Sequence, residues 1–288
     1  YGERVVLRLL DKQAAQINIG DLGLPNSILR NYKNALQLSE GIILVTGPTG
    51  SGKTTTLYSG LRHISDTSQN ILTVEDPIEY TLPGIGQTQV NNKAGYDFAS
   101  GLRSILRQDP DIVMVGEIRD IETAKIAIQA SLTGHLVLST IHTNSAIGAI
   151  ARLRDMGIES YLLSSSLRVV IAQRLVRRLC EDCKTPVKPS ATIQKEFQLE
   201  KNENIYQAVG CANCNNTGFK GRIALAECIN ISDELKALIH DEASEAKLAE
   251  SAFKENLSLD LSSSQLLRDG LTSYEELLRV QNHQDANL

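Results

Sequence analysis

Apolar residues along the first half of the chain form short runs that alternate with helical patterns. Four such runs fall between about residues 40 and 145: "IILVTG" (42–47), "NILTVED" (70–76), "DIVMVGE" (111–117) and "HLVLST" (135–140). Their centres are almost continuously hydrophobic and rich in β-branched residues, which is typical of parallel strands buried on both faces. This alternation predicts an α/β fold with a mostly parallel sheet covered by helices.

Two longer helical patterns follow this region. In the second, apolar residues recur at about helical spacing up to the basic "QRLVRRL", which predicts a helix. The residues that carry this pattern are Tyr161, Leu162, Leu167, Val170 and Ile171.

The composition changes again between Cys180 and about Arg222, where Cys, Asn, Lys, Gly and Pro dominate with little periodicity. This change predicts a small separate module. The tail then returns to helical patterns, with a stop at Gly270. Either of two pairs offers a capping box for the last helix, namely Thr272 with Glu275 or Ser273 with Glu276.

Composition narrows the function classes. The chain has 288 residues, 42% of them hydrophobic, and a formal net charge of -5. Its apolar runs are far shorter than the roughly 18 to 20 residues of a membrane-spanning helix. The acidic balance argues weakly against nucleic acid as the main ligand. Because the chain starts at Tyr1 and no basic-then-apolar leader follows, we expect it to be a piece of a longer protein with domains upstream.

"GPTGSGKT" fits the phosphate-binding motif G-x-x-x-x-G-K-[ST] and lies between a predicted strand and a predicted helix. Backbone N–H groups and the helix N-terminus would bind phosphate there. We expect Lys53 to reach the β- and γ-phosphates of ATP and the Thr54 hydroxyl to bind Mg²⁺. The alternative is a glycine-rich turn with a chance lysine. The predicted nucleotide-binding residues are Gly47, Pro48, Thr49, Gly50, Ser51, Gly52, Lys53, Thr54 and Thr55.

Acidic residues follow two other predicted strands. Glu75, Asp76 and Glu79 come at the end of "NILTVED" and just beyond it, and Glu117 ends "DIVMVGE". Ligands of open α/β sheets lie beyond the carboxyl ends of the strands, so we expect these carboxylates to face the phosphate-binding loop. Glu117 would then act on the metal side, and Glu79 would orient or deprotonate the attacking water. The alternative for the first cluster is a solvated turn stiffened by Pro77.

Two histidines bracket the strand "LVLSTI". His142 follows the strand and is therefore expected at the ligand edge, where it could donate a hydrogen bond to the γ-phosphate. His135 precedes the strand, at the opposite end unless the loop folds back. A structural or surface role remains the alternative for both.

Two CxxC pairs, Cys180 with Cys183 and Cys211 with Cys214, predict one tetrahedral zinc site with four thiolates and no open position. Such a structural ion would stabilise a module too small to have its own core. A redox dithiol is the alternative. The fifth cysteine, Cys228, is expected in the core. This cysteine usage indicates a reducing compartment.

Taken together, these motifs resemble the secretion ATPases of type II secretion and type IV pilus assembly. The resemblance rests on "VTGPTGSGKTTTLY", "ILTVEDPIEY", "LRSILRQDPDIVMVGEIRD", "TGHLVLSTIHTNSA" and the two CxxC pairs in this order, and it covers nearly the whole chain. The segment "RLRDMGIESYLLSSSL" looks closer to the type II secretion member than to a pilus-extension motor.

The resemblance implies several roles that spacing alone does not give. It makes Glu79 the catalytic base, Glu117 the end of an atypical Walker B motif, and His135 and His142 parts of a histidine box. It also implies a homo-hexamer in which the preceding domain supplies an arginine to the nucleotide. In "YGERVVLRLLDK" the positions that match by resemblance are Arg8 and Arg4.

The whole sequence therefore predicts a hexameric, ATP-hydrolysing motor subunit that powers type II secretion, with ATP, Mg²⁺ and Zn²⁺ bound. We expect it at the cytoplasmic face of the bacterial inner membrane, bound indirectly through secretion-platform proteins. A pilus-extension motor and a nucleic-acid-handling ATPase that grips the backbone through its zinc module and "QRLVRR" are the alternatives. The expected parts are the end of an upstream domain (1–19), a RecA-like domain (20–177), the tetracysteine module (178–222) and a helical C-terminal domain (223–288).

Overall fold

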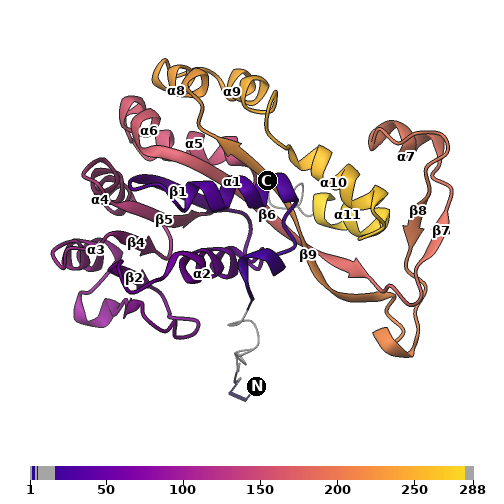
Figure 1. Cartoon of the computed structure of the whole chain (residues 1–288), viewed down its shortest axis with the longest axis horizontal. Coiled ribbons are helices and arrows are strands. Elements are labelled where there is room, and N and C mark those ends of the chain that lie inside the picture. The colour runs from indigo at the N-terminus through magenta and orange to yellow at the C-terminus, as the bar shows by residue number, and fades with distance from the viewer. Residues whose placement is uncertain (1, 4, 6–16, 283–288) are drawn as a thin grey trace.

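The computed structural model describes residues 2, 3, 5 and 17–282. Its centre is a seven-stranded sheet in the order β3-β2-β4-β5-β1-β6-β9 (Figure 1). Every neighbouring pair is parallel except β6 with β9. The strands are β1 (Gly41–Thr46), β2 (Ile71–Glu75), β3 (Gly86–Gln89), β4 (Ile112–Val115), β5 (Leu136–Ile141), β6 (Leu167–Leu179) and β9 (Phe219–Asn230).

The four strands predicted from apolar runs are confirmed as β1, β2, β4 and β5. Each alternates its side chains between two separate hydrophobic layers, as β1 does with Ile42 and Ile43. Helices cover both faces, which explains why these runs carry almost no polar residue. One layer packs against α3 (Phe98–Leu106), α4 (Ile121–Leu132), α5 (Ala146–Asp155), α6 (Ser160–Ser166), α8 (Asp233–His240) and α9 (Glu245–Ala252), and the other against η2 (Ile19–Asp21), α1 (Asn26–Ala35) and α2 (Lys53–Ile64).

The helix predicted to continue up to "QRLVRRL" is wrong in its second half. The helix α6 ends at Ser166, and residues 167–179 form the strand β6. This segment is buried along most of its length because its side chains enter the hydrophobic layers on both faces of the sheet, while β1 pairs with one edge and β9 with the other. Tertiary pairing therefore overrides the apolar spacing, and the β-branched residues that fitted a helix only approximately fit a two-sided strand well.

The tail does not return to helix at residue 223 as predicted. Residues 223–230 belong to β9, which pairs antiparallel with β6 over almost its full length. Cys228 on this strand is 1% exposed, so its prediction as a core residue is confirmed. The remaining tail is helical, and the Ser273 hydroxyl accepts a hydrogen bond from Glu276 N at 3.3 Å, which selects the second of the two predicted caps.

The cysteine-bearing segment lies between β6 and β9, at the end of the molecule opposite α3 and α4 (Figure 1). It is not without a core. Phe197, Leu199 and Ile205 share a hydrophobic cluster with Leu267 and Leu277 from the C-terminal helices. The elements of this end are β7 (Thr185–Val187), α7 (Ala191–Glu196), β8 (Ile205–Gln207), η4 (Ala212–Cys214), α10 (Leu259–Arg268) and α11 (Tyr274–Asn282), while η3 (Asn92–Ala94) lies before α3.

Candidate active site

The phosphate-binding motif has the strand-loop-helix context that it requires. The strand β1 ends at Thr46, and α2 begins at Lys53 after a loop that uses positive φ at Gly47, Gly50 and Gly52. The N-cap of α2 is Gly52, which has no side chain that could cap the helix. The first N–H groups of α2 therefore point, without a capping side chain, at the position that an anion would take.

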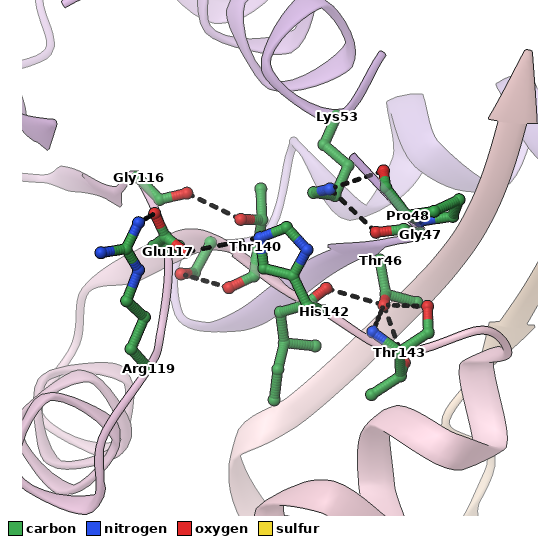
Figure 2. Close-up of polar contacts among 12 residues, drawn as sticks. Thr46, Gly47, Pro48, Lys53, Gly116, Glu117, Arg119, Thr140, His142 and Thr143 are labelled. Carbon is green, nitrogen blue, oxygen red and sulfur yellow. Dashed lines mark hydrogen bonds and ion pairs between the residues drawn. The ribbon is translucent and has the colours of Figure 1, made fainter. Parts of the chain in front are cut away.

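Lys53 closes over this loop. Its Nζ donates hydrogen bonds to Gly47 O at 2.8 Å and to Pro48 O at 3.0 Å (Figure 2). Burial lowers the pKa of Lys53, and the negative charge of Glu117 opposes that shift. The ammonium is thus partly desolvated and held close to the cradle, which strengthens its attraction for a phosphate group.

One cavity of about 980 Å³ joins seven of the nine predicted nucleotide-binding residues, all except Gly47 and Pro48, to three further predicted catalytic residues. The loop and the start of α2 line one side through Thr49–Thr55, and the acidic segment at the end of β2 lines another through Glu75, Asp76 and Glu79. Glu117 and His142 complete the lining from the ends of β4 and β5. Four segments separated in the sequence therefore meet at the carboxyl edge of the sheet.

Glu117 lies between the side chains of Arg119 and His142. Its Oε1 is 2.5 Å from the Arg119 guanidinium, and its Oε2 is 3.4 Å from His142 Nε2 (Figure 2). The backbone around it is fixed because Thr140 Oγ1 donates to Gly116 O at 2.8 Å and Ile118 N donates to Thr140 O at 2.9 Å. The end of β5 thereby sets the position of the Glu117 carboxylate, which is 14% exposed.

The loop that carries His142 is also tied to the phosphate-binding loop. Thr46, the last residue of β1, donates to Ile141 O at 2.7 Å and accepts from Thr143 N at 2.9 Å (Figure 2). Burial, then the charge of Lys53, lowers the pKa of His142 despite the opposing charge of Glu117. The imidazole is therefore neutral at pH 7.

Glu75 differs from the other predicted acids, because its carboxylate is turned into a buried network. It accepts hydrogen bonds from the Tyr58 hydroxyl, from Thr73 Oγ1 at 2.5 Å and from Gln87 Nε2 at 3.0 Å, and the residue is 3% exposed. Burial, reinforced by this carboxylate, raises the pKa of Tyr58. Glu75 lines the cavity with Asp76 and Glu79, as predicted, but its hydrogen-bonding capacity is used inside the protein.

This network reaches the segment that carries Glu79. Gln87 on β3 accepts from Leu82 N at 2.7 Å and donates to Tyr80 O at 3.2 Å. The Tyr80 ring packs edge-on against Tyr58 with centroids 4.6 Å apart. One side chain on β3 therefore holds the backbone just beyond Glu79 while Tyr58 connects it to the phosphate-binding helix.

One further predicted catalytic residue, His135, is not brought to the cavity. His135 lies at the start of β5, on the opposite edge of the sheet, and its Nδ1 is 3.0 Å from Ala130 O. Parallel strands make this separation unavoidable, since only their carboxyl ends reach the cavity. Arg8 lies outside the described residues, as does Arg4.

The four cysteines of the CxxC pairs gather at one point, with their sulfur atoms within 4.8 Å of one another. Adjacent sulfurs are 3.8 to 3.9 Å apart, close to the roughly 3.8 Å edge of a tetrahedron with metal-sulfur bonds of about 2.3 Å. Burial raises the pKa of Cys214, but hydrogen bonds from Cys211 N, Gly218 N and neighbouring thiols outweigh it and lower the pKa to about 6. The cluster thus fits a four-thiolate metal site.

A sequence profile described as "Type II/IV secretion system protein" matches residues 1–279. The chain belongs to this family. The chain is 53% identical over 282 residues to the type II secretion system ATPase E of Vibrio cholerae, and 54% identical over the same length to a putative type II secretion system protein E of Escherichia coli. It is also 53% identical over 281 residues to the type II secretion system protein E of Pseudomonas aeruginosa. The resemblance stated from the motifs is therefore confirmed.

This family member spans only part of its relatives' length. The alignments cover 97% of the chain but 56% of the V. cholerae protein and 57% of the E. coli protein.

Among solved structures, the pilus retraction motor PilT with bound ADP is similar with a TM-score of 0.70 and 29% identity, over 92% of this chain and 66% of that one. The ATPase DotB of Legionella pneumophila shares the fold, with a TM-score of 0.67 over 93% of this chain and 66% of that one, at 24% identity.

Some residues of the family member's cavity were missed by sequence reasoning. Leu175 of β6 and Arg222 of β9 line it beside the phosphate-binding loop. A correct strand assignment for these two segments would have indicated them, because β6 pairs with β1 and extends past its end.

Within residues 17–282, no helix is both long and apolar enough to cross a membrane.

Proposed function

We propose that this chain is the ATP-hydrolysing part of a motor subunit that powers type II protein secretion. The proposal rests on one observation above all: Lys53, Glu79, Glu117 and His142 line a single cavity in a chain of the type II/IV secretion family. The names of its relatives support type II secretion over pilus extension, since proteins at 50 to 54% identity are named for that system.

ATP binds with its phosphates in the loop between β1 and α2. Lys53 leaves its two carbonyl partners and turns to the β- and γ-phosphates, a more favourable partner for an ammonium than a neutral oxygen. The Thr54 hydroxyl and the Glu117 carboxylate line the cavity and are the oxygen ligands that Mg²⁺ prefers. A magnesium ion held there supplies positive charge that neutralises the β- and γ-phosphates.

Glu79 is the base in this scheme. It is half-buried at the cavity, and the backbone beside it is held by Gln87. A carboxylate on a fixed backbone can orient a water molecule and take its proton as the γ-phosphoryl group leaves. Glu75 is unsuited to this role because its two oxygens already accept hydrogen bonds from Tyr58, Thr73 and Gln87.

His142 reports the presence of the γ-phosphate. Its neutral imidazole contacts Glu117 through Nε2 at 3.4 Å and lies on a loop tied to β1 through Thr46 and Thr143. A hydrogen bond from the imidazole to the γ-phosphate would be lost on hydrolysis, so the loop that carries His142 would lose a contact when the γ-phosphate leaves. His135, on the opposite edge of the sheet, would act only across a subunit boundary in a hexamer.

The remaining assignments extend the family resemblance to this chain. It works as a homo-hexamer at the cytoplasmic face of the inner membrane, with Arg8 completing the nucleotide site and secretion-platform proteins as partners. The cysteine cluster holds a structural Zn²⁺, for which its sulfur spacing is suited. A nucleic-acid-handling ATPase is the alternative; DNA-stimulated hydrolysis with salt-dependent DNA affinity would favour it.

Phosphate release from Mg-ATP, together with sedimentation in a non-hydrolysable analogue, tests the proposal. Lys53→Ala should abolish turnover and weaken nucleotide binding, because it removes the ammonium group that is hydrogen-bonded to the phosphate-binding loop at Gly47 O and Pro48 O. Wild-type-like hydrolysis in Lys53→Ala would refute the assignment of this cavity. A folded monomer that binds the analogue but turns over slowly would instead support a requirement for subunit assembly.

A further inference from the structure

The register between β1 and β6 brings one residue, Gln173, beside the phosphate-binding loop. The two strands pair up to Thr46 and Ala172, so the next residues along them are Gly47 and Gln173. They are so close that a Cβ at Gly47 would lie 2.2 Å from Gln173 O. The loop therefore leaves the sheet in direct backbone contact with β6, and Gly47 is required for that contact.

The side chain of Gln173 makes a second connection. It is almost fully buried, and its Nε2 donates to Ser51 O at 2.8 Å while its Oε1 accepts from Thr56 Oγ1 at 2.9 Å. Ser51 lies within the loop and Thr56 in the first turn of α2. A carboxamide offers a donor and an acceptor on one rigid plane, so this single group bridges the loop and the helix that follows it.

The loop needs such a support most when a nucleotide is bound. In the structure, Lys53 holds the loop through Gly47 O and Pro48 O, and these bonds must break when the ammonium turns to phosphate. The Gln173 bridge joins the loop to β6 through Ser51 O and does not depend on Lys53. It can therefore remain in place when the lysine leaves.

We propose that Gln173 is a positioning residue for the nucleotide, which keeps the phosphate-binding loop in its anion-binding conformation through the bridge between Ser51 and Thr56. The inference rests on the proposed function of the cavity. It assigns no contact between Gln173 and the nucleotide. Its effect is on the geometry of the N–H groups that bind phosphate, and hence on affinity.

The test compares nucleotide affinity in variants that remove the bridge with a matched variant that removes a hydrogen bond to another part of β6. Gln173→Met keeps the length of the side chain but removes both hydrogen bonds, and Thr56→Val removes one of them. Thr272→Val is the control, because Thr272 is also a buried threonine whose single side-chain hydrogen bond reaches β6, at Arg177 O and 2.9 Å. Binding of fluorescent ADP with Mg²⁺ is measured at a temperature where circular dichroism shows each variant folded.

We expect Gln173→Met to weaken ADP binding roughly tenfold and Thr56→Val a few-fold, since each leaves a buried polar group without its partner. The effects of Thr56→Val and Gln173→Met should not add in the double variant, because both act on one bridge. Thr272→Val should lower the melting temperature and leave ADP affinity unchanged. A role in packing alone predicts wild-type affinity for Gln173→Met, because methionine fills a similar volume.

Wild-type ADP affinity in a folded Gln173→Met variant would overturn the inference. If that variant does not fold, Thr56→Val decides, and an unchanged affinity there overturns it equally. Failure of the wild-type chain to bind ADP has a different meaning, because it would refute the proposed function of the cavity itself.

Discussion

Glu276 offers a sharp test of how the C-terminal helix α11 is held to the sheet. The carboxylate is buried and accepts hydrogen bonds from Arg177 N at 2.9 Å and Arg177 Nε at 2.9 Å, and from Arg279 Nη2 at 2.6 Å. Burial favours the neutral acid, but these bonds outweigh it and lower the pKa of Glu276 to about 2. We therefore predict that Glu276→Gln destabilises the chain.

The size of the effect follows from the pKa difference. An ordinary glutamate has a pKa of about 4.3, so a value of about 2 in the folded state corresponds to roughly 3 kcal/mol of stability. The two arginine side chains are 47% exposed, and solvent screening reduces their share. We expect Glu276→Gln to lower the free energy of unfolding by about 2 kcal/mol at pH 7.

The same reasoning fixes the pH dependence. Because the folded pKa of Glu276 is depressed, its contribution is complete above the unfolded pKa and is lost as the pH falls toward about 2. Urea unfolding should therefore show a difference between wild type and Glu276→Gln that is constant from pH 8 to pH 6. The difference should shrink by about 1 kcal/mol by pH 3.5.

Glu275→Gln is the matched control, because the neighbouring glutamate is exposed in the same helical turn. It should change stability by less than about 0.5 kcal/mol. Equal stability of wild type and Glu276→Gln at pH 7 would refute the argument, and so would a difference that stays the same down to pH 3.5.

Three further predictions concern the active site and the cysteine cluster. Glu79→Gln should bind ATP as the wild type does and lose hydrolysis, measured as phosphate release; loss of binding would count against a role as base. Bound phosphate should raise the pKa of His142, so analogue binding should strengthen from pH 8 to pH 6 more in wild type than in His142→Gln; identical pH profiles would exclude a phosphate contact. Native mass spectrometry should find one zinc ion per chain in wild type and none in Cys214→Ser; metal-free wild type, freshly purified and reduced, would contradict the zinc assignment.

Much of the active site could be predicted because its chemistry is encoded locally. The loop at residues 47–54 and the acids Glu79 and Glu117 follow strands whose apolar runs are easy to recognise, and parallel strands bring their carboxyl ends together. The same geometry separates His135 from His142 by the length of β5, as the sequence had suggested. The position of each of these residues relative to the end of its strand was therefore enough to predict the edge of the sheet at which it lies.

The features that could not be predicted depend on partners far away in the sequence. Glu75 has the same acidic neighbours as Glu79, and its distant partners Tyr58 and Gln87 help to hold its carboxylate in a buried network. The strand β6 reads as helix because its apolar spacing is ambiguous, and its pairing with β1 and β9 decides the outcome. Gln173, placed by that pairing, carries no motif of its own.

The strand β6 runs from beside the phosphate-binding loop to the cysteine cluster. Gln173 contacts the phosphate-binding loop, Leu175 lines the cavity, and Arg177 binds Glu276 of α11. Three residues later, Cys180 begins the cysteine cluster. Past the end of β1 this strand is paired only with β9, whose Glu227 accepts hydrogen bonds from the N-termini of α5 and α10. The paired strands β6 and β9 therefore connect the phosphate-binding loop to the cysteine cluster and, through Glu227, to α10, and their register shifts once along this path, between Arg177 and Leu179.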